Sequence, residues 1–117
     1  DPLMRVGNLE HKRDFTDVRD VARAYTLLLE KGQSGKAYNI ASGHMTPIQV
    51  ILDTLCDIAQ VHPRTEIDPD LFRPTDSRPS YNTSRIHQDT GWEPEIPLRD
   101  SLQAVYDDVV TRRTAGA

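Results

Sequence analysis

The sequence predicts a helix-rich, mixed α/β fold with short strands. Apolar residues recur at helical spacing in three segments, 18–29, 48–59 and 98–109. Between these segments lie short stretches of β character, and none of them is long enough to anchor an independent sheet. The 117 residues have the length of one ordinary domain with a single core.

The first third of the chain predicts a strand, a loop and a helix. Residues 4–9 have β character and lead into a polar loop at 10–14. Asp17 suits the N-cap of the helix that follows, and Gly32 suits its end. We expect one apolar stripe of this helix to face the core. The stripe comprises Val18, Val21, Ala22, Tyr25, Leu28 and Leu29.

The middle third predicts a strand, a helix and another strand. Residues 37–41 have strand character and are followed by turn residues. Thr46 and Gln49 have the spacing of a capping box, with Pro47 at the first helical position. Residues 65–68 then have the character of a third short strand.

The last third begins with a proline-rich segment, 68–79, which we expect to be an ordered loop. Proline lacks the backbone N–H that a helix interior or a central strand needs. Residues 84–90 predict a short helix that ends at Gly91. Residues 98–109 carry the apolar face of a final helix.

Composition narrows the class of protein. The formal net charge of −4 argues against a nucleic-acid partner, because binding to a phosphate backbone needs clustered positive charge. Cys56 is the single cysteine, which fits a reducing cytoplasm. The apolar runs are too short for a transmembrane helix, and the first residues lack the zones of a signal peptide. We therefore expect a cytoplasmic protein with no nucleic-acid and no membrane partner.

Catalytic, cofactor and metal motifs are missing from the sequence. It contains no glycine-rich dinucleotide motif and no P-loop. No catalytic triad can be assembled, and the histidines lie too far apart in sequence for a metal motif. These histidines are His11, His44, His62 and His87. We therefore predict no catalytic, cofactor-binding or metal-binding residue within this chain.

Two arginine-bearing segments are the candidate binding elements. Arg13 precedes the first helix, and Arg73 lies in the proline-rich loop. An arginine held by a rigid loop suits phosphate oxygens, because its donors are planar and always charged. Asp76, three residues after Arg73, has the chemistry to accept hydrogen bonds from ribose hydroxyls. The alternative is that both arginines form structural salt bridges to Asp14, Asp17 or Asp76.

At these residues the chain resembles the extended short-chain dehydrogenase/reductase family that acts on nucleotide sugars. The resemblance is greatest to its GDP-mannose branch of 4,6-dehydratases and 4-keto-sugar reductases. Matching segments follow one another in the family's order along almost the whole chain. They are Val6–Leu9, Arg13–Val21, Tyr38–Gly43, Arg73–Asp76, Asn82–Arg85 and Thr90–Pro94.

The resemblance implies a division of labour within a longer enzyme. Arg13 and Arg73 would bind the nucleotide's diphosphate, and Asp76 would bind its ribose. The glycine-rich cofactor loop and the catalytic residues of the family lie in an amino-terminal Rossmann lobe, which is absent from this chain. Residues 1–113 would then be the carboxy-terminal nucleotide-sugar-binding lobe, followed by a frayed tail at 114–117.

The function implied is that of the substrate-binding lobe of a GDP-sugar dehydratase or reductase. NADP or NAD would be bound mainly by the absent lobe, so we expect this chain alone to bind no cofactor and to show no turnover. The resemblance also implies a homo-oligomeric parent enzyme. A free-standing helical interaction module without catalysis is the alternative from a different class.

Overall fold

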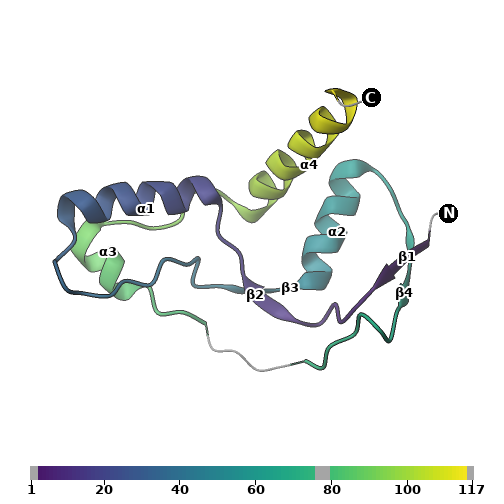
Figure 1. The fold of residues 1–117 in the computed structure, drawn as a ribbon, viewed down its shortest axis with the longest axis horizontal. Helices are drawn as coiled ribbons and strands as arrows, with labels where there is room; N and C mark the ends of the chain where they lie inside the picture. The colour runs from purple at the N-terminus through teal and green to yellow at the C-terminus, as the bar shows by residue number, and fades with distance from the viewer. Residues whose placement is uncertain (1–2, 76–79, 116–117) are drawn as a thin grey trace. The chain divides into compact units, whose positions relative to one another are not determined.

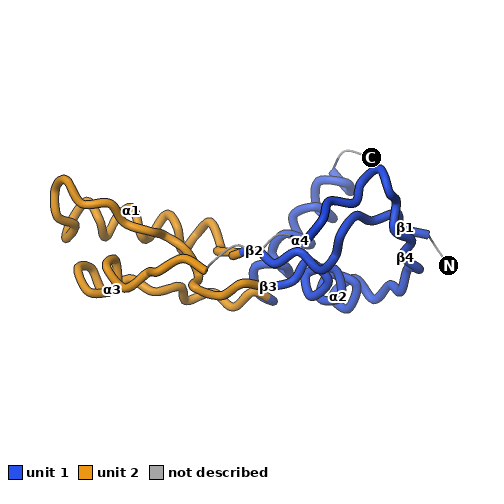
Figure 2. Tube along the Cα trace, turned by 90° about the horizontal axis from the view of Figure 1, so that it is seen from below, with its two compact units in different colours: residues 1–13, 46–78, 99–117 blue, residues 14–45, 79–98 orange. Residues whose placement is uncertain are grey.

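A computed structural model describes residues 3–75 and 80–115. The chain divides into two compact units, whereas its length predicts one core (Figure 2). Unit 1 comprises residues 1–13, 46–78 and 99–117, and unit 2 comprises residues 14–45 and 79–98. None of the helices in the described ranges is both long enough and apolar enough to cross a membrane.

Unit 1 contains a small parallel sheet and two helices (Figure 1). The elements are β1 (Leu3–Val6), α2 (Ile48–Ala59), β4 (Arg64–Ile67) and, except for its first residue, α4 (Leu98–Ala115). Strands β1 and β4 pair in parallel, with Val6 opposite Ile67. Parallel strands are normally covered on both faces, yet Ile67 is 60% exposed and Leu3 is 48% exposed. This strand pair therefore leaves apolar surface open to solvent.

The amino terminus of α2 differs from its prediction. Thr46 and Pro47 lie in a short strand, β3 (Met45–Pro47), and the helix starts at Ile48 with no side-chain cap. Its first backbone N–H groups bond to loop carbonyls instead: Ile48 N donates to His11 O at 2.8 Å and Gln49 N donates to Leu9 O at 2.9 Å. Because these carbonyls satisfy the helix start, the capping-box prediction is wrong.

Unit 2 is built around a small core between two helices. Helix α1 (Val18–Lys31) has Asp17 as its N-cap, and α3 (Ser84–Thr90) ends at Gly91 in the left-handed conformation, both as predicted. The fully buried cluster consists of Ala24, Ile86 and Trp92. Leu27, Leu28, Tyr38 and Ile40 pack against this cluster.

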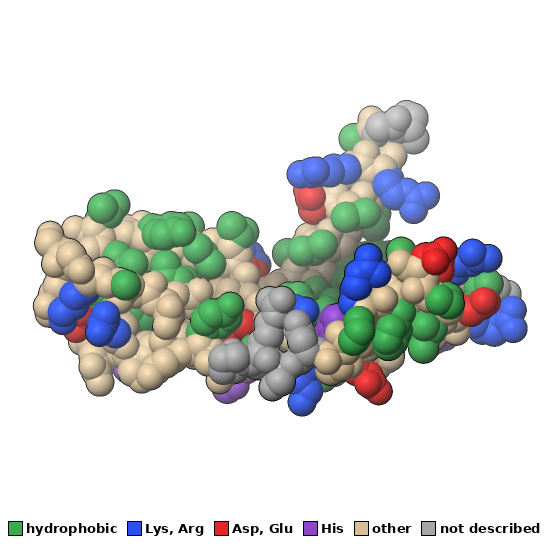
Figure 3. Space-filling model, turned by 60° about the horizontal axis from the view of Figure 1, so that its bottom comes forward, with side chains coloured by type: hydrophobic (Ala, Val, Ile, Leu, Met, Phe, Trp, Pro, Cys, Tyr) green, Lys and Arg blue, Asp and Glu red, His purple; other side chains and the backbone are tan. Residues whose placement is uncertain are grey.

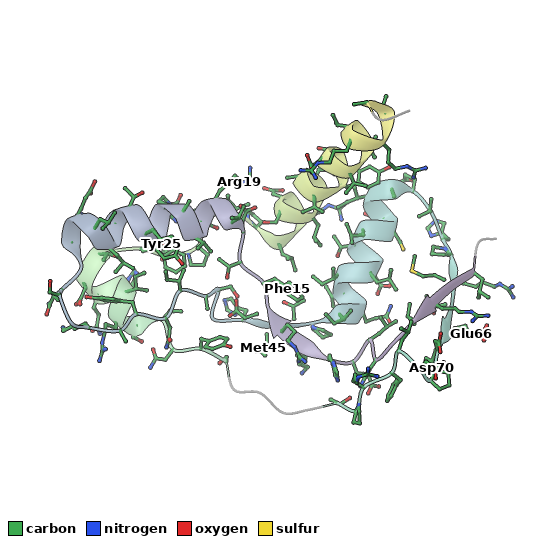
Figure 4. The ribbon with its side chains drawn as sticks, in the orientation of Figure 1. Phe15, Arg19, Tyr25, Met45, Glu66 and Asp70 are labelled. Carbon is green, nitrogen blue, oxygen red and sulfur yellow. The ribbon has the colours of Figure 1, made fainter. Side chains whose placement is uncertain are left out.

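The buried face of α1 is not the predicted apolar stripe. Asp20 and Ala24 are the buried residues of this helix. Val18 is 75% exposed, Tyr25 is 60% exposed and Leu29 is 90% exposed. Hydrophobic side chains accordingly lie on the surface of unit 2 in Figure 3, and Tyr25 is labelled on α1 in Figure 4. The stripe predicted to face the core is largely solvent-exposed in the described structure.

Two strand predictions also need correction. Residues 37–41 have no strand assignment, because no described strand pairs with them. Conversely, part of the expected polar loop at 10–14 forms β2 (Lys12–Asp14), which pairs with β3. Helix α4 runs through Ala115 and so includes two residues of the expected tail.

Tyr38 and Asp89 form a hydrogen-bonded pair in unit 2. The Tyr38 hydroxyl donates to Asp89 Oδ2 at 2.7 Å and accepts from Gln33 N at 2.9 Å. The bond from Tyr38, followed by the charge of Lys36, lowers the pKa of Asp89 below its ordinary value. The same bond to the Asp89 carboxylate raises the pKa of Tyr38 above its ordinary value. The bond therefore requires an ionised Asp89 and a protonated Tyr38.

This pair predicts a pH-dependent part of the stability. A lowered carboxylate pKa stabilises the fold at pH values above the unfolded-state pKa, and this stabilisation is lost in acid. A raised phenol pKa stabilises the fold at pH values below the unfolded-state pKa, and this stabilisation is lost in alkali. The free energy of unfolding should therefore differ between the wild type and Tyr38→Phe by a constant amount between about pH 5 and 9, and the difference should shrink below about pH 4 and above about pH 10. Urea unfolding at stepped pH measures it, with Tyr25→Phe as the exposed control. An undiminished difference at pH 3 would contradict the assignment.

Candidate functional site

The second arginine segment follows β4 closely. Its loop begins with a turn in which Leu71 N and Phe72 N donate to Asp68 O, at 2.9 and 3.0 Å. Asp68 N in turn donates to Val6 O at 2.9 Å, which continues the pairing of β1 with β4. Asp70, labelled in Figure 4, lies within this turn. The strand pair therefore fixes the start of the loop that carries Arg73.

Gly7 lets the two chain segments approach each other closely. A Cβ added at this position would lie 2.6 Å from Leu71 O, a backbone atom that can shift only together with its loop. Any side chain at position 7 would therefore push the loop away from the end of β1. The glycine is part of the sequence resemblance, and this contact gives a physical reason for it.

Asn8 and His11 hold the rest of this loop. Asn8 Nδ2 donates to Arg73 O and to Thr75 Oγ1, both at 2.8 Å, and Asn8 Oδ1 accepts from Glu10 N at 2.9 Å. His11 Nε2 donates to Pro74 O at 2.7 Å. All of these residues belong to unit 1. The structure therefore joins the segment before Arg13 to the loop that carries Arg73, more than sixty residues later in the sequence.

The two predicted arginines differ in how their side chains are held. Arg13, on β2, is partly buried, and its Nη1 donates to Lys12 O at 2.7 Å. Arg73 is exposed, and among the described residues its Nη1 makes long bonds to Asp70 O at 3.3 Å and Phe72 O at 3.2 Å. No described carboxylate forms an ion pair with Arg73. The third predicted residue, Asp76, lies outside the described residues.

Asp14, next to Arg13, is fixed in unit 2. Its two carboxylate oxygens accept from Ser42 N at 2.8 Å and Gly43 N at 2.9 Å, and Oδ1 also accepts from Thr16 Oγ1 at 3.1 Å. The alternative interpretation of the sequence makes Asp14 a salt-bridge partner. The contacts show that it binds the turn at 42–43, within the same unit.

Unit 2 has a shallow polar depression of about 370 Å³. It is lined by Ser42, His44, Thr83, His87, Trp92, Glu93 and Pro94. One of its histidines is already engaged, because His87 Nδ1 lies 3.3 Å from Trp92 O. Within the described ranges, no group of three or more histidine, cysteine or acidic side chains could hold a metal ion.

The starts of α1 and α2 lack the features that bind the diphosphate of a nicotinamide dinucleotide. Its diphosphate needs a helix start with free backbone N–H groups after a glycine-rich turn. The start of α1 is occupied by the Asp17 carboxylate, and the first N–H groups of α2 bind loop carbonyls. Pro47, which has no N–H, precedes α2. The starts of these two helices are therefore unsuited to the diphosphate of NADP or NAD.

The comparisons with known proteins agree with the sequence resemblance. The family model of GDP-mannose 4,6 dehydratase matches residues 1–105. The chain belongs to the GDP-mannose 4,6-dehydratase family. A relative from Pseudomonas aeruginosa, GDP-6-deoxy-D-mannose reductase, is 39% identical over 110 residues, which are 93% of this chain and 36% of the relative.

Solved structures of other enzymes are similar to the fold of this chain. The structure of RMD from Pseudomonas aeruginosa complexed with NADPH superposes with a TM-score of 0.87 at 38% identity, over 94% of this chain and 36% of that one. A dTDP-glucose 4,6-dehydratase from Bacillus anthracis in complex with NAD has a TM-score of 0.75 at 21% identity, over 88% of this chain and 33% of its own, and shares the fold alone. The predicted helix-rich α/β class is confirmed, and the chain spans about a third of the length of these relatives.

The sequence indicates the two arginine segments but not the residues that join them. In the sequence, Asn8 is notable only as part of the family resemblance, and His11 only as one of four scattered histidines. One local signal was available for Asn8, because it follows Gly7 at the end of a strand, where a polar side chain often bonds to a neighbouring loop. Nothing near His11 in the sequence points to Pro74.

Proposed function

We propose that the chain is the carboxy-terminal substrate-binding portion of a GDP-sugar dehydratase or reductase, and that Arg13 and Arg73 bind the diphosphate of the nucleotide. The observation that carries the proposal is that Asn8 and His11, in the segment before Arg13, form hydrogen bonds to the loop that carries Arg73. The family match and the identity to a reductase support the substrate class.

Physical chemistry supports a binding role for Arg73 in particular. Its backbone is held by a short bond from Asn8, while the bonds of its guanidinium to described residues are long and go to carbonyls of its own turn. A fixed backbone with an exposed, weakly engaged guanidinium suits a ligand phosphate, since little must be broken before the new bonds form. Binding of the ribose by Asp76 stays a prediction from the resemblance.

The rest of the enzyme would cover the apolar surface that this chain exposes. Val18, Tyr25 and Leu29 leave one side of α1 uncovered, and the β1–β4 pair leaves Leu3 and Ile67 open. Apolar surface of this extent favours burial against another part of the protein. We propose that a cofactor-binding lobe supplies this cover together with NADP or NAD and the catalytic groups, so that the chain alone shows no turnover. Of the two reactions, the named reductase relative favours reduction of the 4-keto sugar.

The test is the dissociation constant for GDP of the chain and of its Arg73→Ala variant. A charge-assisted hydrogen bond contributes about 1.5–3 kcal/mol, so the variant should bind GDP at least about tenfold more weakly. Isothermal titration calorimetry measures both constants.

Arg64→Ala is the matched control. Arg64 is an exposed arginine of the same unit and opens β4. Its removal changes the net charge by the same amount, and GDP binding should change by less than about twofold at moderate salt. Equal dissociation constants for GDP in the wild type and Arg73→Ala would contradict the binding role of Arg73.

A further inference from the structure

Asn8 makes more contacts than a loop residue needs for its own turn. Both protons of its amide nitrogen are used, one on Arg73 O and one on Thr75 Oγ1, each at 2.8 Å. Its amide oxygen accepts from Glu10 N at 2.9 Å. Because the oxygen is held on one side, the amide nitrogen is directed at the loop, and an asparagine has no spare donor left.

The two acceptors flank the residue that His11 binds. Arg73 and Thr75 lie on either side of Pro74, whose carbonyl accepts from His11 at 2.7 Å. Three consecutive residues of the loop are thus bonded to side chains from the segment between β1 and β2. The backbone of Arg73 is fixed from outside its own loop, whereas its side chain is held only weakly.

We propose that Asn8 is a positioning residue for diphosphate binding, which acts on the ligand through Arg73. The inference rests on the proposed function of Arg73. Without the Asn8 amide, Arg73 O loses its anchor, and the guanidinium samples positions away from the phosphate. Binding then requires the loop to be ordered again, and this ordering lowers the affinity.

The test is a double-mutant cycle on the dissociation constant for GDP, measured by calorimetry on the full chain. Asn8→Ala should weaken GDP binding about fivefold to tenfold, because it removes the anchor without adding charge. In the Arg73→Ala background, the same change should alter binding by less than about twofold, because the residue on which Asn8 acts is gone.

Asn39→Ala is the matched control. Asn39 Nδ2 also donates to a distant carbonyl, Asn82 O at 3.0 Å, but it lies in unit 2. This variant should leave GDP binding within about twofold of the wild type. Circular dichroism and thermal unfolding confirm that each variant is folded before titration.

Thr75→Val keeps the proposal testable if Asn8→Ala does not fold. It retains the shape of the side chain and removes one of the two acceptors, so GDP binding should weaken about threefold. Equal losses from Asn8→Ala in both backgrounds would overturn the positioning role, as would unchanged affinity in Asn8→Ala or, in its place, Thr75→Val. If Arg73→Ala itself leaves GDP binding unchanged, both the proposed function and this inference fail.

Discussion

Replacing Trp92 with alanine is expected to lower the free energy of unfolding by about 3–5 kcal/mol, the cost typical of removing a buried aromatic side chain. Trp92 is only 1% exposed and packs against Ala24 of α1 and Ile86 of α3. Its indole N–H donates to Asp20 O at 2.9 Å, and Arg23 lies 5.9 Å from the ring centroid. Trp92 is one of the largest fully buried side chains of the described residues, so its removal leaves a cavity in the core of unit 2.

Chemical denaturation followed by far-ultraviolet circular dichroism measures the change, because the variant lacks the tryptophan needed for fluorescence. Tyr25→Ala is the control: it removes an aromatic side chain from α1 that is 60% exposed, and it should cost less than about 1 kcal/mol. Equal losses from Trp92→Ala and Tyr25→Ala would contradict the assignment of the core.

Removing the Asp20 carboxylate should cost about 3 kcal/mol, because it removes a buried acceptor and leaves several part-buried donors without partners. Asp20 is 2% exposed. Its oxygens accept from Glu95 N at 3.2 Å and Ile96 N at 3.1 Å, and from Arg23 Nη2 at 3.3 Å. The carboxylate thus ties α1 to the segment that leads into α4, and Asp20→Ala breaks that connection while Arg23 loses its buried counter-charge.

Asp57→Ala provides the comparison for Asp20→Ala. Asp57 pairs with Arg99 at 2.7 Å, a shorter distance than any of those at Asp20, but both side chains are more than half exposed. An exposed pair of this kind contributes up to about 1 kcal/mol. Denaturation curves of the two variants should therefore separate clearly. Similar losses would mean that distance rather than burial sets the contribution.

The parts of the fold that the sequence predicted depend on local chemistry. The N-cap at Asp17 and the stop at Gly91 each need only a short stretch of backbone and the right residue. The capping box at Thr46 failed although its residues were suitable, because carbonyls of Leu9 and His11, distant in sequence, satisfy the start of α2. Local propensity gave way to a tertiary contact.

The remaining errors concern which surfaces are covered. The apolar stripe of α1 predicted a core-facing side, but Tyr25 and Leu29 are exposed and the polar Asp20 is buried. Periodicity shows that a helix has an apolar face and does not show what covers it. The hydrogen bond between Asn8 and Arg73 could not be predicted from the sequence for the same reason, since a contact across 65 residues leaves no local pattern.

The most direct test of the proposed function is a GDP titration of the full chain, followed by backbone amide signals in nuclear magnetic resonance spectra. We expect saturable shifts at residues 8–13 and 71–75 that fit one dissociation constant, while the signals of α4 stay in place. A helical interaction module would leave both arginine segments undisturbed. Shifts that are absent, or confined to the depression around His44 and His87, would contradict a diphosphate site at Arg13 and Arg73.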